Sequence, residues 1–348
     1  MEIENKVIGL LNSTSTTIAL AIAYKTGILK VLLDYEEPLT PAAVAAVAKT
    51  DVRYTKEILA VLATGTILEI RGEHEEKYLM PLRLRGPIRN FGPYFEEMPL
   101  LCECAFSSVA AAAKTGDGIA YEKYGRFSDW MGRAADEKHR ATLISKFVPA
   151  VEGGLLQSQL QKGGVEFLDV GCGEGEVLLL LAAAFPSSNF TGIDLDVTAI
   201  QVAEQRAKDR GLSNVRFVAS DISAFLEAEE KHGAFDWVSA FDVIHDLSKP
   251  AVALKQIHAC LKKGAGGAFL MVDIKAKTPV RENAHNSFAP FLYCVSLMHC
   301  MPVGLRDGGD GLGMMWGEEK ASELLKEAGF GDVTIQEADS FNNLFVCR

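Results

Sequence analysis

Three glycines alternate along a short stretch that follows a β-rich run ending at position 170. Gly171, Gly173 and Gly175 form a G-x-G-x-G pattern, and Asp169 lies two residues before it. Glycine lets a backbone turn sharply and approach a bound molecule more closely than other residues do. An apolar run follows at once and is typical of a helix. The spacing therefore predicts a strand, a tight loop and a helix that together bind a nucleoside-bearing cofactor.

The charge of this loop indicates which cofactor it binds. Loops of the dinucleotide-binding type place a pyrophosphate at a helix N-terminus, where carboxylates would repel it. Here Glu174 and Glu176 accompany Asp169, and Glu176 stands where the third glycine of G-x-G-x-x-G would fall. We therefore expect a cationic ligand. S-adenosylmethionine (SAM), which carries an ammonium and a sulfonium group, meets this requirement.

With this motif the sequence resembles the class I, Rossmann-like SAM-dependent methyltransferases. Acids at the ends of the next two predicted strands extend the resemblance. Asp194, about twenty residues after the loop, can accept both ribose hydroxyls, while Asp196 is typical of a helix cap. Asp221 matches the family position that accepts the adenine amino group, or else it is only an N-cap. The predicted cofactor-binding residues are Asp169, Gly171, Gly173, Gly175, Asp194, Leu195, Asp221, Ile222 and Phe241.

The fourth predicted strand and its exit match the fourth motif of the family and should face the transferred methyl group. Methyl transfer is an in-line displacement, and an acceptor hydroxyl or protonated amine must also lose a proton. His245 is the predicted base, although it could instead cap or fix the following helix. His299 is the second candidate, ahead of His285. The predicted substrate pocket consists of Trp130, Asp242, Tyr293, His299 and Trp316.

Strands and helices alternate from position 161 onward, as in a parallel sheet covered on both faces. The predicted strands are 165–170, 189–195, 214–219, 235–243, 266–274, 333–338 and 343–347. The last two form a hairpin, which places one antiparallel strand in a seven-stranded class I methyltransferase sheet. The long segment 275–317 is predicted to be a lid or substrate wall, with a helix over 288–301.

The first part of the chain has a different pattern. Helices are predicted over 13–33, which Gly27 could divide in two, from Pro41 and over 53–64, and a hairpin over 67–71 and 77–80. Three helices and a hairpin resemble a winged-helix α+β domain. In small-molecule methyltransferases of this architecture that module serves dimerisation, so the resemblance implies a homodimer. The predicted domains are 1–85 (winged helix), 86–160 (helical connector) and 161–348 (methyltransferase).

Charge and cysteine content indicate which classes of partner the protein binds and where it is located. The net charge of -11 over 348 residues argues against nucleic acid and anionic membranes as main partners. No apolar stretch is expected to approach the roughly 18 residues of a membrane span. Seven cysteines make no disulfide framework and predict a reducing, cytoplasmic location. Cys102 and Cys104 have no second pair at zinc-ribbon spacing, so no metal site is predicted.

These patterns together predict an enzyme that transfers a methyl group from SAM to a small-molecule acceptor, with oxygen favoured over nitrogen. Two alternatives from other classes stay open at this point. A SAM-binding winged-helix transcriptional regulator would require a basic face for DNA. A nicotinamide-dependent oxidoreductase would require the glycine loop to hold a pyrophosphate.

Overall fold

The computed structural model describes residues 2–264 and 267–348, and the chain divides into two compact units, one ending at Glu103 and the other beginning at Cys104. The predicted division into three domains at positions 85 and 160 stays a prediction. Each unit is described by itself below.

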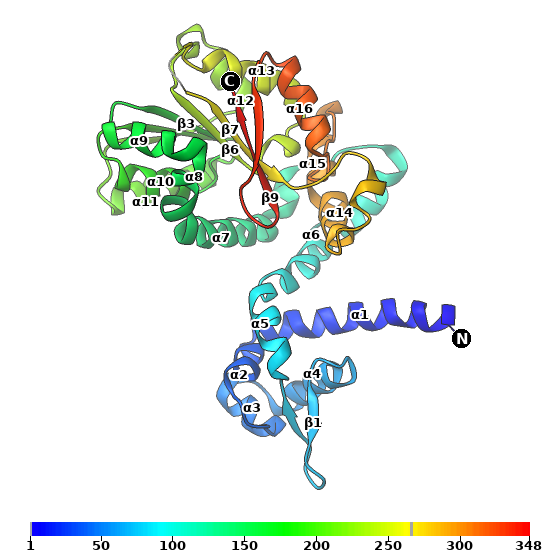
Figure 1. The fold of residues 1–348 in the computed structure, drawn as a ribbon. Helices are drawn as coiled ribbons and strands as arrows, with labels where there is room; N and C mark the ends of the chain where they lie inside the picture. The colour runs from blue at the N-terminus through cyan, green and yellow to red at the C-terminus, as the bar shows by residue number, and fades with distance from the viewer. Residues whose placement is uncertain (1, 265–266) are drawn as a thin grey trace. The chain divides into compact units, whose positions relative to one another are not determined.

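The first unit is built from helices and one short hairpin (Figure 1). Its elements are α1 (Glu2–Lys25), α2 (Ile28–Asp34), α3 (Pro41–Ala48), α4 (Val52–Thr64), β1 (Glu69–Arg71), β2 (Lys77–Leu79), α5 (Leu82–Phe91) and the start of α6 (Tyr94–Thr115). The helix predicted over 13–33 is two helices, because Gly27 has a left-handed φ of 80° between them. Leu29, Leu59 and Leu62 are buried at the centre of the unit. The order of elements is the predicted one, while the winged-helix assignment itself stays a prediction.

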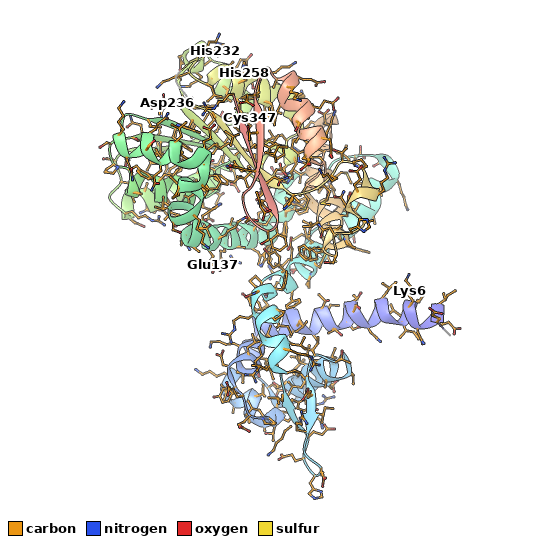
Figure 2. The ribbon with its side chains drawn as sticks, viewed as in Figure 1. Lys6, Glu137, His232, Asp236, His258 and Cys347 are labelled. Carbon is orange, nitrogen blue, oxygen red and sulfur yellow. The ribbon has the colours of Figure 1, made fainter. Side chains whose placement is uncertain are left out.

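The expectation that no apolar stretch approaches the length of a membrane span was wrong. Helix α1 begins at Glu2, has a mean hydropathy of 1.4 and is long and apolar enough to cross a membrane by length and composition. Only 22% of its most apolar window is buried. Its N-terminal half projects from the other helices of the unit (Figure 1), and Lys6 extends from it (Figure 2). The absence of a membrane partner and a cytoplasmic location therefore stay predictions.

The second unit contains the predicted seven-stranded sheet, in the order β5-β4-β3-β6-β7-β9-β8. All neighbouring strands are parallel except β9, which is antiparallel to both β7 and β8. This confirms the predicted fold class. The strands are β3 (Glu166–Val170), β4 (Asn189–Asp194), β5 (Val215–Ala219), β6 (Trp237–Phe241), β7 (Phe269–Ile274), β8 (Val333–Glu337) and β9 (Asn342–Cys347). Residue 266, where the fifth strand was predicted to begin, lies outside the described residues.

Helices cover both faces of the sheet because side chains alternate along each strand. One face packs against α9 (Leu155–Lys162), α10 (Glu176–Ala184) and α11 (Val197–Asp209). The other packs against α12 (Ile222–Leu226), α13 (Pro250–Cys260) and α16 (Glu318–Glu327). Phe167 and Trp237 point to the first face, and Leu168 and Val238 to the second. Cys347 ends β9 fully buried in the second layer (Figure 2).

Two largely helical segments flank the carboxyl ends of these strands. The first comprises η1 (Tyr121–Tyr124), α7 (Gly125–Thr142), η2 (Leu143–Phe147), α8 (Val148–Ala150) and η3 (Val151–Gly154). The second lies between β7 and α16 and comprises η6 (Val280–Asn283), α14 (Ala289–Val295), η7 (Ser296–Cys300), α15 (Met301–Gly304) and η8 (Arg306–Gly308). The helix predicted over 288–301 is thus present, but η7 in its middle is a π-helical turn. We call α14, η7 and α15 the lid helix.

Candidate active site

The glycine loop joins β3 to α10, and its glycines have different roles. Gly171, Gly173 and Gly175 have φ angles of 69°, 52° and 81°, a region that side chains disfavour. A Cβ at Gly171 would come within 2.4 Å of Val243, so this glycine permits close packing. A Cβ at Gly173 would meet no atom within 4 Å. Gly173 therefore has open space beside it, as a backbone that lies against a bound ligand requires.

Asp194 ends β4 and holds this loop in place. Its Oδ2 accepts a hydrogen bond of 2.8 Å from the Gly173 amide, and its Oδ1 accepts one of 2.9 Å from the Asp196 amide. Burial raises the pKa of Asp194, and these hydrogen bonds partly oppose that shift. A carboxylate offers about four lone-pair sites, so Asp194 keeps capacity for a hydroxyl donor. Leu195, next in sequence, is 54% exposed, and Asp196 caps α11 as predicted.

The other predicted cofactor residues lie at neighbouring strand ends. Asp169 is buried and accepts a hydrogen bond of 2.5 Å from Ser239 on β6, and burial raises its pKa to about 7. Asp221 caps α12 through Oδ1 alone, and Ile222 is buried in the second layer. Phe241 at the end of β6 packs with its ring 5.2 Å from that of His139. Their contacts with a cofactor stay predictions.

The structure corrects the reasoning from charge about Glu174 and Glu176. Glu176 is buried and accepts hydrogen bonds of 2.8 Å from Arg140 Nε and 2.6 Å from Arg210. Glu174 pairs with Arg206. Because these arginines neutralise both carboxylates, the loop does not present the negative charge that the sequence suggested. The pairs instead tie α10 to α7 and α11.

His245, the predicted base, follows β6 on η5 (Ile244–Asp246) and is 3% exposed. Its Nδ1 lies 2.8 Å from Oδ1 of Asp273 on β7, and its Nε2 lies 3.5 Å from Oδ1 of Asp246. Burial by itself lowers the pKa of His245, but the charges of Asp273 and Asp246 outweigh burial and raise it well above its ordinary value. The alternative role for His245, capping the following helix, has no support, because α13 has no side-chain cap.

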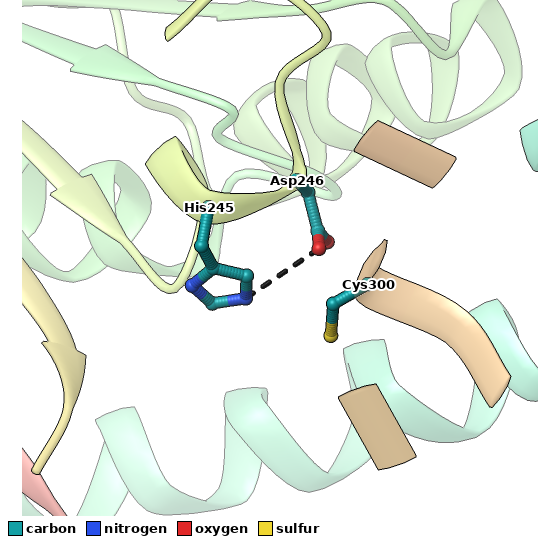
Figure 3. A group of neighbouring side chains, drawn as sticks. All are labelled: His245, Asp246 and Cys300. Carbon is teal, nitrogen blue, oxygen red and sulfur yellow. Dashed lines mark ion pairs between the residues drawn. The ribbon is translucent and has the colours of Figure 1, made fainter. Parts of the chain in front are cut away.

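The lid helix brings two further side chains to His245. Cys300 on η7 is buried, and its sulfur lies with ligand atoms of His245 and Asp246 in a group that spans at most 4.8 Å (Figure 3). His299, also on η7, is 1% exposed, and its Nδ1 lies 4.0 Å from Oδ2 of Asp246 and 3.7 Å from the sulfur of Cys300. Burial lowers the pKa of His299, and it raises that of Cys300 to about 12.

Aromatic rings surround His299. The rings of Tyr124 and Phe127 approach its imidazole edge-on, with centroids 4.6 and 5.0 Å away, and the hydroxyl of Tyr124 donates a 2.8 Å hydrogen bond to the Met298 carbonyl. Trp130 stacks on Phe127 at 5.8 Å, so it belongs to the same wall, one ring removed from His299.

The remaining predicted pocket residues lie in different surroundings. Asp242 follows β6 with a positive φ of 56°, and Asn342 donates to both of its carboxylate oxygens at 3.3 and 3.4 Å. Burial raises the pKa of Asp242 to about 6. Tyr293 accepts a hydrogen bond from Asn283, and Trp316 is buried in the second layer of the sheet. The structure thus groups His245, Asp246 and His299, while pocket roles for Trp130, Asp242, Tyr293 and Trp316 stay predictions.

Sequence reasoning missed Asp273. Its signal was an acid inside the otherwise apolar strand Phe269–Ile274, where a charge is unexpected unless a partner lies opposite. Cys300 is not among the predicted site residues, since nothing in its spacing relates it to His245.

In the sheet order the antiparallel strand β9 is second from one edge, and the glycine loop follows β3. Together these two features define a class I methyltransferase. Residues 161–341, just over half of the chain, match the family described as "Methyltransferase domain". The chain therefore belongs to this methyltransferase family, whose members use SAM. This settles the choice against a nicotinamide-dependent oxidoreductase.

Individual proteins extend the comparison. The malonyl-[acyl-carrier protein] O-methyltransferase of Paenibacillus sp. is 26% identical over 49% of this chain and 57% of that protein. The ubiquinone biosynthesis O-methyltransferase of Paracidovorax citrulli is 30% identical over 33% of this chain and 46% of that protein. The chain therefore matches only about half the length of these relatives.

Solved structures share the fold over the whole chain. Human N-acetylserotonin methyltransferase in complex with SAM has a TM-score of 0.63 at 17% identity, covering 100% of this chain and 98% of that one. An O-methyltransferase family protein from Burkholderia thailandensis has a TM-score of 0.67 at 14% identity, covering 99% and 97%. At such identities the likeness shows the fold alone.

Proposed function

We propose that this protein transfers a methyl group from SAM to a small-molecule acceptor, and that the acceptor atom is oxygen rather than nitrogen. The observation that carries the proposal is the buried pair of His245 and Asp273, which lies after β6 and on β7, the two strands that follow β3 in the sheet order. In open α/β sheets ligands bind at the carboxyl ends of strands, near the point where the strand order reverses. That point here lies between β3 and β6.

The residues at the glycine loop fit the cofactor. The open side of Gly173 admits a ligand against the backbone, Asp194 has lone pairs free for ribose hydroxyls, and Asp221 has Oδ2 free of the capping bonds. The exposed Leu195 offers an apolar surface beside Asp194. When bound, SAM supplies an electrophilic methyl group. The chain contributes the rigid strand ends that hold the two reactants in line.

The acceptor side favours a hydroxyl. An alcohol or phenol must lose one proton as its oxygen is methylated, whereas a neutral amine attacks without prior loss of a proton. Asp273 fixes the orientation of the His245 ring by holding Nδ1, which leaves Nε2 to take that proton when the ring is neutral. Because the raised pKa of His245 favours the imidazolium, turnover should increase as the pH rises. The carboxylates of Asp273 and Asp246 then stabilise the imidazolium that forms. The names of the relatives include both O- and N-methyltransferases, so the preference for oxygen rests on His245 and Asp273.

We also infer that the protein works as a cytoplasmic homodimer in which α1 forms the contact. Its exposed apolar side chains are Ile3, Val7, Ile8, Leu10, Leu11, Ile18 and Ile22. A second copy of the chain offers the same row of side chains to cover them, as a two-fold interface requires.

Two measurements test the proposed function. A calorimetric titration should give heat with SAM and none with NADH. A screen of hydroxyl- and amine-bearing small molecules with isotopically labelled SAM should then label hydroxyl compounds. Label on amines alone would contradict the preference for oxygen, and absence of SAM binding would contradict the function as a whole.

A further inference from the structure

Two pairs of adjacent residues meet beneath the lid helix and bring together four side chains of metal-ligand type. His245 and Asp246 come from η5, and His299 and Cys300 come from η7. The ligand atoms of His245, Asp246 and Cys300 all lie within 4.8 Å of one another (Figure 3). Three of the four side chains, all but that of Asp246, are more than nine-tenths buried.

Some of the polar atoms in this cluster lack a hydrogen bond. Among the described residues, Oδ1 of Asp246 is a buried side-chain atom without a hydrogen-bond partner. Nε2 of His299 also lacks one, but the nitrogen of that ring near Asp246 and Cys300 is Nδ1. Leaving a buried donor or acceptor unsatisfied costs about 1–3 kcal/mol. A cation bound to Oδ1 of Asp246 would remove that cost for this atom. This observation is independent of the spacing of the three ligand atoms.

The donor set selects the kind of ligand. A thiolate, an imidazole and a carboxylate are ligands for zinc, whereas Mg²⁺ and Ca²⁺ require oxygen donors almost exclusively. A zinc-bound histidine commonly donates its other ring N–H to a carboxylate, and Nδ1 of His245 does so to Asp273. This hydrogen bond directs the Nε2 lone pair of His245 toward Asp246 and Cys300. Tetrahedral zinc would draw the three ligand atoms to roughly 3.5 Å from one another.

We propose that His245, Asp246 and Cys300 form a binding site for Zn²⁺, with His299 at its edge, and that zinc bound there inhibits the enzyme. Binding forms one bond from zinc to each of Nε2, a carboxylate oxygen and the Cys300 sulfur. It releases the thiol proton and the Nε2 proton of the imidazolium to the solvent, without any change of oxidation state. The inhibition rests on the proposed function, because zinc would occupy the atom that takes the proton of the acceptor. The binding does not depend on it.

The test uses the full chain after treatment with a chelator, and Co²⁺ serves as a visible substitute for zinc. We expect one Co²⁺ per chain, a thiolate-to-cobalt charge-transfer absorption, and loss of that absorption when Zn²⁺ is added. Cys300→Ala should abolish the absorption and weaken zinc binding at least tenfold. Cys294→Ala, on the same lid helix, is the matched control and should retain both. Asp273→Asn should weaken zinc binding by about 10- to 100-fold while the absorption persists at saturating Co²⁺.

The outcomes separate this inference from the proposed function. Zinc should lower the turnover of wild type and of Cys294→Ala, a chelator should restore it, and Cys300→Ala should need at least tenfold more zinc for the same loss. Equal zinc affinity in Cys300→Ala and wild type, or the absence of a thiolate-to-cobalt absorption, overturns the site. Tight binding at the site without any effect on turnover overturns the inhibition. A protein that binds zinc as expected but transfers no methyl group refutes the proposed function and leaves the site in place.

Discussion

Nδ1 of His245 lies 2.8 Å from Oδ1 of Asp273, and the two side chains are 3% and 1% exposed. This short contact between a buried imidazole and a buried carboxylate fixes the orientation of the ring. It also determines that Nε2 is the nitrogen that does not contact Asp273. The pair is therefore suited to accept one proton at a defined position.

Replacing His245 should separate catalysis from cofactor binding. We expect His245→Ala to lower kcat roughly 100- to 10,000-fold, the usual contribution of a general base, while the affinity for SAM measured by calorimetry changes little. Asp273→Asn should also lower kcat, because it removes the carboxylate that orients His245. His285→Ala, which alters an exposed histidine, is the control and should behave like wild type. Unchanged turnover in His245→Ala would contradict the role of His245 as the general base.

The arginine pairs of the glycine loop predict unequal effects of two similar substitutions. The Glu176 side chain is 2% exposed and accepts from Arg140 and Arg210, whereas that of Glu174 is 32% exposed and pairs with Arg206. Glu176→Gln should lower the free energy of unfolding by about 1–3 kcal/mol. Glu174→Gln should lower it by less than about 1 kcal/mol. Chemical denaturation measures both, and equal losses would contradict the different burial.

Glu97 on α6 makes stability depend on pH. It is 7% exposed, and burial raises its pKa from 4.5 to about 8. Since the folded state favours the protonated acid, its contribution is complete below pH 4.5 and is lost as the pH rises to about 8. The loss is at most about 1.4 kcal/mol per pH unit. Glu97→Gln should therefore be more stable than wild type at pH 8 and similar at pH 4. Parallel pH profiles of the two thermal midpoints would refute this.

The apolar face of α1 can be tested through oligomeric state. Leu10 and Leu11 are 64% and 66% exposed. Changing both to Asp should convert a dimer into a monomer in sedimentation experiments, because charge cannot be buried between two copies of the helix. Asn12→Asp adds a charge at an exposed polar position of the same helix and should leave the dimer intact. A wild-type protein that sediments as a monomer would contradict the proposal directly.

Local patterns predicted much of the fold and part of the site. The alternation of strands and helices, the glycine loop and the cap at Asp196 each depend on residues close in sequence. Contacts between distant elements could not be predicted. Asp273 meets His245 only because β7 lies beside β6, and Arg140 reaches Glu176 only because α7 packs on α10.

The π-helical turn at 296–300 shows how one residue can matter without touching any ligand. A π turn contains one residue more than the α-helix around it, and in η7 both His299 and Cys300 are buried. Removal of one residue from this turn would restore an ordinary helix in which the flanking residues keep their facing, but the widened turn that carries both His299 and Cys300 would be lost. Among homologous proteins, the length of this helix is therefore a countable sign of whether the cluster beneath it exists.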